Sequence, residues 1–242
     1  MEYRTDFLVI GGGIAGLTFA LKAASFGTVA VLTKKSKFDA ATTLAQGGIA
    51  SVISEEDSFI AHINDTLTAG AGLCHRDVVE QIIRDGPNRI KELIELGVRF
   101  TKRRIKSEDV LDLAREGGHS KRRIVHAEDL TGKEIMRVLV SKAEENKNIK
   151  FFENHIAIDL ITKRKLFRNR KLEDDQCYGA YVLDINTKEI HTFIAKIILL
   201  ATGGAGKVYL YTTNPDISTG DGIAMAYRAG AKIANMEFVQ FH

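Results

Sequence analysis

Phe7-Leu-Val-Ile-Gly-Gly-Gly-Ile-Ala-Gly16 is the stretch of sequence that decides the fold of this chain. Its first four residues are wholly apolar, which is typical of a buried parallel strand. After the glycines, apolar residues continue at helical spacing up to Gly27, and residues 28–33 form a second apolar run. We therefore expect a β-α-β unit at the start of an α/β domain with a parallel sheet.

Gly11, Gly13 and Gly16 have the spacing G-x-G-x-x-G between the predicted strand and the predicted helix. The first glycine permits a tight turn, the second lets the backbone approach a pyrophosphate, and the third lets the helix pack closely on the strand. The helix N-terminus then presents free N–H groups and the positive end of its dipole to the phosphates. In this context the motif predicts a dinucleotide site in a Rossmann-like domain, rather than a merely structural turn.

The end of the second predicted strand lacks the acidic residue that usually binds the ribose hydroxyls, and reads Thr33-Lys34-Lys35 instead. Three interpretations of Lys34 stay open: a solvated side chain, a contact to the adenosine end of the cofactor, or a site for the 2′-phosphate of an NADP-type cofactor. Residues 41–48 are small and glycine-rich, so their backbone could contact a flat ligand, although a flexible turn explains them equally well.

The middle of the chain is predicted to be helical and then irregular. Two amphipathic helices are expected, one capped by Asp77 and the other running from about Pro87 to Gly97. Residues 101–123 are polar and basic, and are interpreted as a long loop. A capping box at residues 131–134 starts a further helix.

After Asn148 the apolar period drops to two, which indicates strands. The expected strands of a β-meander, with a charged hairpin tip at 163–175, are 151–152, 155–161, 177–183 and 189–193. Residues 197–201 are predicted to be a fully buried strand, and residues 236–242 to begin another. Asp221, at the start of a helix, can accept hydrogen bonds from cofactor hydroxyls, cap the helix, or do both.

A polar loop follows the expected helices: Arg115-Glu-Gly-Gly-His-Ser120, then Arg122, Arg123 and His126. A carboxylate, imidazoles and guanidinium groups around two glycines can bind an anion or act in acid–base catalysis, whereas solvated loop charges would give the same pattern. The basic residues nearby lack aromatic partners, so we do not expect nucleic-acid binding.

The composition is that of an ordinary globular protein. The 242 residues include 34 Lys and Arg against 31 Asp and Glu, so the net charge of +3 indicates no polyanion partner. No apolar run reaches the roughly 18 residues that span a bilayer, and the N-terminus lacks a signal-peptide pattern. Cys74 and Cys177 lack metal or redox spacing, and are interpreted as reduced core residues. We expect a soluble, cytosolic protein with no metal site and no membrane partner.

Taken together, these motifs resemble the succinate dehydrogenase/fumarate reductase flavoprotein family, and within it the members that oxidise L-aspartate. The resemblance covers the whole chain, and long matches in order are more specific than the first glycine motif. Its strongest segments are residues 43–50, 115–120, 122–127, 209–218, 220–226 and 236–242.

The resemblance implies an FAD-binding domain and hydride transfer from a small dicarboxylate to the flavin. It also explains the missing acid, because the aspartate-oxidising members carry a Ser/Thr-Lys pair at that strand end. Succinate dehydrogenases have a histidine that bonds covalently to FAD where this chain has Ala41, so non-covalent FAD is expected. By similarity, the FAD-binding residues are Gly11, Gly12, Gly13, Ile14, Ala15, Gly16, Lys34, Ala41, Thr42, Thr43, Leu44, Ala45, Gln46, Gly47, Gly48 and Asp221.

Glu116 and His242 are the catalytic residues that the resemblance implies. Succinate and fumarate enzymes have an apolar aromatic residue at the position of Glu116, whereas a carboxylate there favours the α-ammonium of L-aspartate. His242 matches a histidine that holds a substrate carboxylate. The expected reaction is oxidation of L-aspartate to iminoaspartate with O2 or fumarate as electron acceptor, the first step of NAD biosynthesis, with quinolinate synthase as a candidate partner. The alternatives are a soluble fumarate reductase, which Glu116 disfavours, and a non-catalytic FAD-binding module.

The resemblance also sets the expected domain boundaries. Residues 1–235 would form the FAD-binding domain, with helical and β-meander insertions at about 51–195, and residues 236–242 would begin a capping domain that is otherwise absent. Members of the family continue into segments that supply the arginine proposed to transfer a proton. We therefore expect an α/β, Rossmann-like portion of a longer enzyme, truncated before its capping domain and with little activity of its own.

Overall fold

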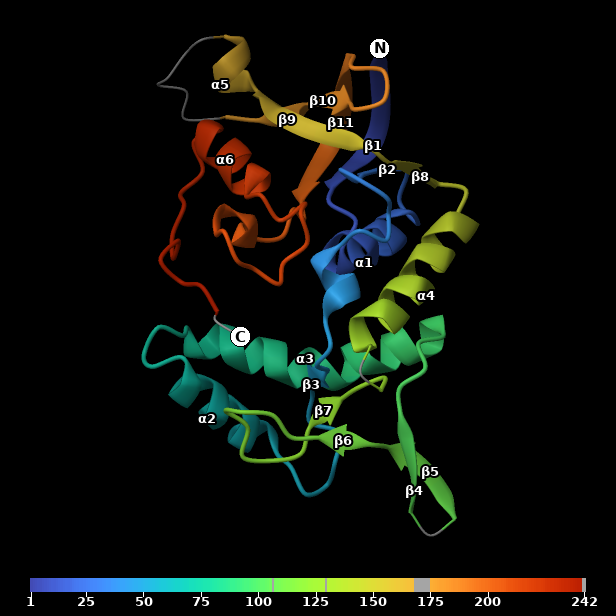
Figure 1. Cartoon of the computed structure of the whole chain (residues 1–242), viewed down its shortest axis with the longest axis vertical. Coiled ribbons are helices and arrows are strands. Elements are labelled where there is room, and N and C mark those ends of the chain that lie inside the picture. The colour runs from blue at the N-terminus through green and yellow to red at the C-terminus, as the bar shows by residue number, and fades with distance from the viewer. Residues whose placement is uncertain (106, 129, 168–174, 241–242) are drawn as a thin grey trace. The chain divides into compact units, whose positions relative to one another are not determined.

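The computed structural model describes residues 1–105, 107–128, 130–167 and 175–240 (Figure 1). The chain divides into two compact units: unit 1 comprises Met1–Leu44 with Leu139–His242, and unit 2 comprises Ala45–Val138. Helix α4, Thr131–Glu145, contains the point in the sequence where unit 2 ends and unit 1 resumes.

Unit 1 is built on a six-stranded sheet with the strand order β8-β2-β1-β11-β10-β9. The first four strands in this order are parallel, whereas β10 pairs antiparallel with both β11 and β9. The strands are β1 Glu2–Ile10, β2 Val29–Leu32, β8 Ile149–Phe152, β9 His155–Thr162, β10 Cys177–Asp184 and β11 Ile190–Leu200. Helix α1, Ile14–Ala23, connects β1 to β2, and α6, Asp221–Arg228, packs on the sheet near β9. The predicted α/β fold with a parallel sheet and a β-meander is confirmed.

The core of unit 1 lies along the central strands, where every residue of β2 is buried. Phe193 of β11 is fully buried, stacks on Tyr3 with 4.7 Å between ring centroids, and meets Phe152 edge-on at 4.9 Å. The strand register places Ile10 opposite both Leu32 and Leu200. The carboxyl ends of β1, β2 and β11 therefore meet at one edge of the sheet.

Several strand predictions in unit 1 are wrong in detail. β8 pairs with β2 and so lies outside the meander, which consists of β9, β10 and β11. The strands expected at 189–193 and 197–201 are one strand, β11, because the residues between them stay paired with β1, and it is not fully buried, since Ile197 is 51% exposed. Residues 236–240 form a turn and irregular chain instead of a strand.

The hairpin tip expected at 163–175 contains a short helix, α5, Lys163–Leu166, and residues 168–174 lie outside the described part. Residues 41–44, expected to be loop, form a 3-10 helix, η1, Ala41–Leu44. Cys74 and Cys177 are free thiols, as predicted. Both are only half-buried, and Cys177 packs against the core of unit 1. Within the described residues, no helix is long and apolar enough to cross a membrane.

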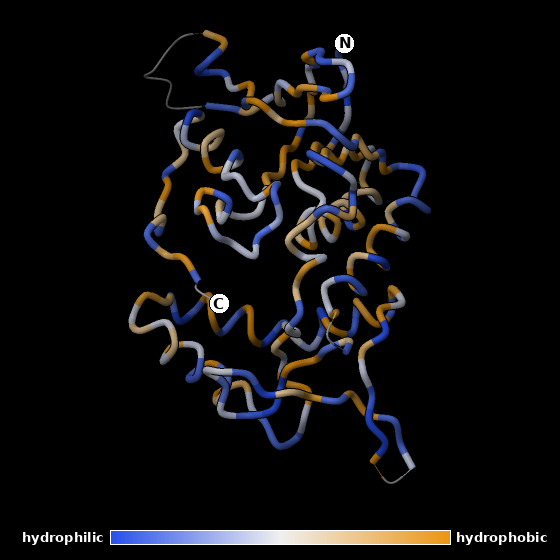
Figure 2. The backbone as a smooth tube through the Cα atoms, viewed as in Figure 1, coloured by the Kyte–Doolittle hydropathy of each residue, from blue (hydrophilic) through white to orange (hydrophobic). Residues whose placement is uncertain are grey.

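The described residues of unit 2 include helices α2 and α3, the first part of α4, and two small sheets. Helix α2 comprises Phe59–Ala69, and α3 comprises Arg76–Leu96. The strands are β3 Ile49–Ala50, β7 Ile124–Val125 and β6 Leu113–Ala114 in one sheet, and β4 Lys102–Ile105 with β5 Glu108–Leu111 in a hairpin. All of β4 is exposed and most of it is hydrophilic (Figure 2). Because this hairpin buries so little, no apolar alternation marks it in the sequence, and the long loop predicted at 101–123 is wrong.

The helix predictions for unit 2 need three corrections. The two helices expected around Pro87 are one, because Ile83, Ile90 and Leu93 continue a single buried face through the proline. His75 is the N-cap residue of α3, and Asp77 lies in its first turn. Helix α2 was not predicted, although the Ser58 hydroxyl accepts the Ala61 N–H as an N-cap should. The αL end of α3 at Gly97 is confirmed.

Helix α4 starts where predicted, at Thr131. The Thr131 hydroxyl accepts the Ala127 N–H at 3.0 Å, and the Glu134 carboxylate accepts the Arg99 N–H at 3.0 Å. These side chains therefore tie the start of the helix to the preceding chain.

Candidate functional site

A cavity of about 340 Å³ opens in unit 1 at the carboxyl ends of β1, β2 and β11. In an open α/β sheet this edge is where ligands bind. The sequence-predicted residues that line it are Gly11, Gly12, Gly13, Ile14, Ala15, Lys34, Ala41, Thr42 and Asp221. Gly16, Thr43 and Leu44, which also belong to unit 1, are not part of its lining.

Glycine is required at two positions of the turn between β1 and α1. Gly11 has φ +113°, and a Cβ there would overlap the carbonyl oxygen of Ala201. A Cβ at Gly16 would overlap the carbonyl oxygen of Gly11, so this glycine lets α1 pack against the end of β1. Because the backbone at these glycines closely approaches neighbouring backbone, no side chain fits there, and the backbone of the turn forms the floor of the cavity.

The N-terminus of α1 faces this cavity without a capping side chain at Gly13. The Ile14 N–H is 3.2 Å from the hydroxyl of Thr42, which accepts its hydrogen bond. Two predicted motifs, the glycine turn and the small-residue segment, thus meet at one helix end. The remaining N–H groups of the first turn and the helix dipole make this end suited to a phosphate.

Lys34 is not a solvated side chain, so that interpretation is wrong. Its Nζ donates to the Ile217 carbonyl oxygen at 2.7 Å and to the Thr219 hydroxyl at 2.6 Å, and lies 2.5 Å from Asp221 Oδ2. Lys34 therefore ties the end of β2 to the segment that enters α6.

Asp221 lies in the first turn of α6, whose N-cap residue is Gly220 with φ +78°, so the N-cap interpretation of Asp221 is wrong. Burial would raise the pKa of Asp221, but hydrogen bonds from Lys34 and Thr219 outweigh it and hold the pKa below its ordinary value. The carboxylate is therefore ionised and ready to accept hydrogen bonds at the cavity wall.

Glu116 lies in unit 2, on an exposed turn. The His119 N–H donates to the Glu116 carbonyl oxygen at 3.3 Å, and Gly118 has φ +80°, as the third residue of a type II turn requires. Glu116 Oε1 is 3.0 Å from the point that a Cβ at Gly47 would occupy. The glycine at 47 therefore leaves room for this carboxylate.

The small-residue segment is divided between the units. Ala41 and Thr42 line the cavity of unit 1, whereas Ala45, Gln46, Gly47 and Gly48 belong to unit 2. The Ala45 carbonyl oxygen accepts the Gly132 N–H at 3.0 Å, and Gly48 packs against the backbone of Val125. His242, the second predicted catalytic residue, lies outside the described residues.

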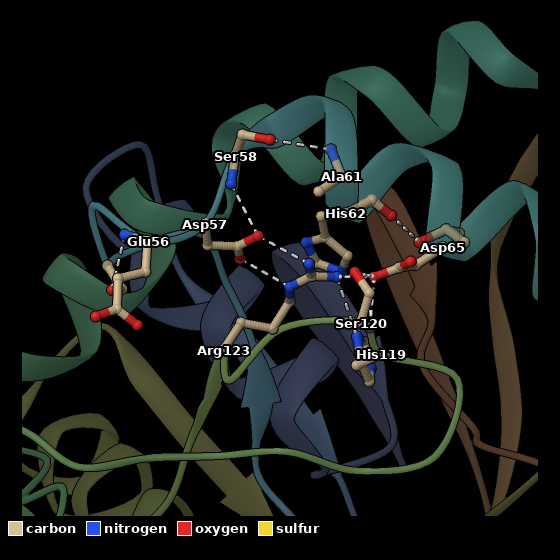
Figure 3. Close-up of polar contacts among 11 residues, drawn as sticks. Glu56, Asp57, Ser58, Ala61, His62, Asp65, His119, Ser120 and Arg123 are labelled. Atoms are coloured by element: carbon tan, nitrogen blue, oxygen red, sulfur yellow. Dashed lines mark hydrogen bonds and ion pairs between the residues drawn. The ribbon is translucent and has the colours of Figure 1, made fainter.

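A buried ion cluster formed by Arg123, Asp57 and Asp65 lies beside His119 and Ser120 (Figure 3). Arg123 Nε and Nη2 donate to the two carboxylate oxygens of Asp57, both at 2.8 Å, and Nη1 donates to Asp65 Oδ2 at 2.7 Å. Arg123 and Asp57 are almost completely buried. Of these three residues, the sequence pattern indicated only Arg123. Asp65 lies three residues after His62 on α2, so both side chains are on one face of the helix. This spacing of two polar residues could have indicated Asp65 as a candidate.

A second polar cluster, also missed, lies on the meander of unit 1. His155, Asp184 and His191 offer ligand atoms within 4.8 Å of one another. His155 Nδ1 is 2.7 Å from the Glu153 carbonyl oxygen, and His191 Nδ1 is 3.2 Å from the Met1 ammonium. Both histidines therefore already have hydrogen-bond partners, and the partner of His191 is cationic.

Residues 6–242 match the sequence family described as FAD binding domain. The L-aspartate oxidase of Acinetobacter baylyi is 51% identical over 240 residues, which are 99% of this chain and 43% of that protein. L-aspartate oxidase 1 of Ralstonia nicotianae is 50% identical over 98% of this chain and 44% of its own length. The chain thus spans less than half the length of these relatives.

Solved structures show the same fold. FrdA of the E. coli quinol fumarate reductase superimposes with a TM-score of 0.84 at 29% identity, over 94% of this chain and 37% of that one. Sdh1 of Mycobacterium smegmatis superimposes with a TM-score of 0.82 at 32% identity, over 94% of this chain and 39% of that one.

Proposed function

We propose that this chain, which belongs to the FAD binding domain family, is the FAD-binding part of an L-aspartate oxidase. The observation that carries the proposal is Glu116: an exposed carboxylate on a glycine turn, placed beside Gly47. L-aspartate differs from succinate by its α-ammonium group, and a carboxylate can bind that group through a charge-assisted hydrogen bond. About half of the residues are shared with enzymes named L-aspartate oxidase, which supports the same conclusion.

The family match confirms FAD as the cofactor, and the cavity of unit 1 fits such a group. A Cβ at Gly11 or Gly12 would meet neighbouring atoms, so the floor of the cavity is backbone that a pyrophosphate can approach. In our proposal the turn from Gly11 to Ala15 holds the pyrophosphate at the N-terminus of α1, and Asp221 accepts hydrogen bonds from ribose hydroxyls. Lys34 keeps Asp221 oriented and ionised. When bound, FAD supplies a two-electron acceptor.

We further propose that FAD is held without a covalent bond, because Ala41 offers no nucleophile to the cavity. Acid precipitation of the flavin-loaded protein should leave all the flavin in the supernatant. Flavin that stays in the pellet would refute this proposal.

Oxidation of L-aspartate is tested in the complete polypeptide that contains this chain. Hydrogen peroxide should form from L-aspartate and oxygen, whereas residues 1–242 alone should form far less. We propose that His242 holds a substrate carboxylate and that residues 1–235 form the FAD-binding domain, with the capping domain beginning at 236. Absence of peroxide from the complete, flavin-loaded polypeptide would refute the function.

The second candidate is a soluble fumarate reductase, which the likeness to FrdA favours. That enzyme would reduce fumarate with an artificial electron donor and would not discriminate in favour of L-aspartate over succinate. Rates measured on L-aspartate, succinate and fumarate with one preparation decide between the two.

We propose that the product is iminoaspartate, that the reaction is the first step of NAD biosynthesis, and that quinolinate synthase is the partner that consumes the product. We also propose that the protein is located in the cytoplasm. The imine hydrolyses readily in water, so direct transfer would preserve it. Faster formation of quinolinate when the two enzymes are mixed than when they are separated by a membrane would support the partnership.

A further inference from the structure

The turn that carries Glu116 is attached to α2 through one carboxylate oxygen. The N–H and the hydroxyl of Ser120 both donate to Asp65 Oδ2, each at 2.8 Å, and Arg123 Nη1 donates to the same oxygen at 2.7 Å. Three donors from the loop and the residue before β7 thus converge on Asp65 (Figure 3). Hydrogen bonds to a charged acceptor are about twice as strong as neutral ones, so this is a firm attachment.

His119 makes a second attachment to the same cluster. Its Nδ1 lies 3.3 Å from Arg123 Nη1. A guanidinium group can only donate, so Nδ1 is the acceptor and the proton of the imidazole is on Nε2. The backbone N–H of His119 closes the turn onto the carbonyl oxygen of Glu116. The anchored residues are therefore connected to Glu116 by the turn itself.

The charges in the cluster keep these attachments in place. Burial would raise the pKa of Asp65, but hydrogen bonds from Ser120 and Arg123 lower it to about 2, so the carboxylate is ionised wherever an enzyme works. Burial and the charge of Arg123 lower the pKa of His62, whose ring lies 5.5 Å from that of His119. Arg123 therefore supplies the positive charge that Asp57 and Asp65 share.

We propose that Asp65 and Arg123 are positioning residues for Glu116. They hold Ser120 and His119, and through the turn they keep the Glu116 carboxylate beside Gly47, where the α-ammonium of the substrate is selected. This inference rests on the proposed function, because it gives Glu116 that role. Arg123 is fully buried, so it acts through the loop and not on the substrate.

Asp57 provides a matched control. It binds Arg123 from the other side with two hydrogen bonds, and none of its hydrogen bonds goes to the loop at 115–120. Both Asp57→Asn and Asp65→Asn weaken the buried ion pair, so a merely structural role predicts the same consequences for both. A positioning role predicts a loss of substrate selectivity for Asp65→Asn alone.

The first measurement is hydrogen exchange at the Ser120 amide, which needs no substrate. Exchange should be about tenfold faster in Asp65→Asn than in the parent protein, and within about twofold of the parent in Asp57→Asn. Ser120→Ala is a milder change, because it removes the hydroxyl donor and keeps the backbone donor, and it replaces Asp65→Asn in this measurement if that variant does not fold. In Ser120→Ala the amides of the turn should exchange a few-fold faster than in the parent protein. An unchanged exchange rate in both Asp65→Asn and Ser120→Ala would overturn the proposal.

The second measurement is kcat/KM in the complete polypeptide. Asp65→Asn and Ser120→Ala should lower kcat/KM for L-aspartate by about fivefold to tenfold and change fumarate reduction by less than about twofold. Added to Glu116→Gln, Asp65→Asn should cause no further loss on L-aspartate, because both changes remove the same interaction. Equal losses on both substrates, or full additivity with Glu116→Gln, would overturn the positioning role. Unchanged selectivity in Glu116→Gln itself would refute the proposed function. The exchange experiment would still test whether Asp65 holds the turn, because it needs no substrate, so the two failures can be told apart.

Discussion

Gly11 takes a backbone conformation, φ +113°, that residues with a side chain rarely adopt. A Cβ there would also overlap the carbonyl oxygen of Ala201, the residue that follows β11. We predict that Gly11→Ala displaces the turn, destabilises the protein by about 1–3 kcal/mol and weakens FAD binding by at least about tenfold. Flavin absorbance per polypeptide after purification measures the binding.

Gly204→Ala is the control for this substitution, because a Cβ at Gly204 meets open space. It should retain the flavin content of the parent protein. If both variants lost flavin equally, the steric argument at Gly11 would be wrong, and the loss would reflect a general sensitivity of this edge of the sheet.

Glu116→Gln keeps the shape of the side chain and removes its charge. A charge-assisted hydrogen bond to the α-ammonium contributes about 1.5–3 kcal/mol, so kcat/KM for L-aspartate should fall by about one to two decades in the complete polypeptide. Fumarate has no ammonium group, and its reduction should be spared. Steady-state rates on both substrates test this, and a change of less than about twofold on L-aspartate would make Glu116 a solvated loop residue.

Helix α3 contains Pro87 in its interior, where the ring supplies no N–H to the carbonyl group of Ile83. A proline in such a place costs about 3 kcal/mol relative to alanine, partly offset because proline also restricts the unfolded chain. We predict that Pro87→Ala raises the free energy of unfolding by about 2 kcal/mol. Denaturant-induced unfolding measures the change.

Pro215, the other proline of the chain, lies outside the helices and is the matched control. Pro215→Ala should be neutral or destabilising by up to about 1 kcal/mol, because it only frees the unfolded chain. A destabilised Pro87→Ala would instead show that the helix uses the proline for packing.

The two units each contain an aspartate whose pKa is about 2. In unit 1, hydrogen bonds from Lys196 and Thr28 to Asp6 lower its pKa. In unit 2, hydrogen bonds from Ser120 and Arg123 do so for Asp65, against the effect of burial. A lowered folded-state pKa contributes stability that is present above the unfolded pKa of about 3.9 and is lost as the pH falls through about 2.

We therefore predict that both units lose stability between pH 4 and pH 2, by about 2 kcal/mol for the contribution of Asp65. Asp65→Asn should flatten this pH dependence in unit 2 only, and Asp6→Asn in unit 1 only. Hydrogen exchange resolved to peptides of each unit, corrected for intrinsic rates at each pH, measures it. If either substitution flattened the pH dependence of stability equally in both units, the contributions of Asp6 and Asp65 would not be independent of each other.

The amino-acid sequence by itself determined the features that depend on neighbouring residues. The apolar run before Gly11, the glycine turn and the helix after it predicted the β-α-β unit. Gly97 predicted the end of α3, and alternation predicted the strands of the meander. Such patterns are decided locally, by the conformational freedom of glycine and by which face of a strand or helix is apolar. The candidate cofactor residues near Gly11 follow from the same local logic.

Only the tertiary structure decided which distant residues meet. Lys34 finds its partners at Ile217, Thr219 and Asp221, and β8 pairs with β2 instead of joining the meander. Arg123 reads as a loop cation in the sequence, yet it is fully buried between Asp57 and Asp65. Local patterns carry no information on such pairings, because a charge can be buried only where another part of the chain brings its counter-charge and hydrogen-bond partners to the same place.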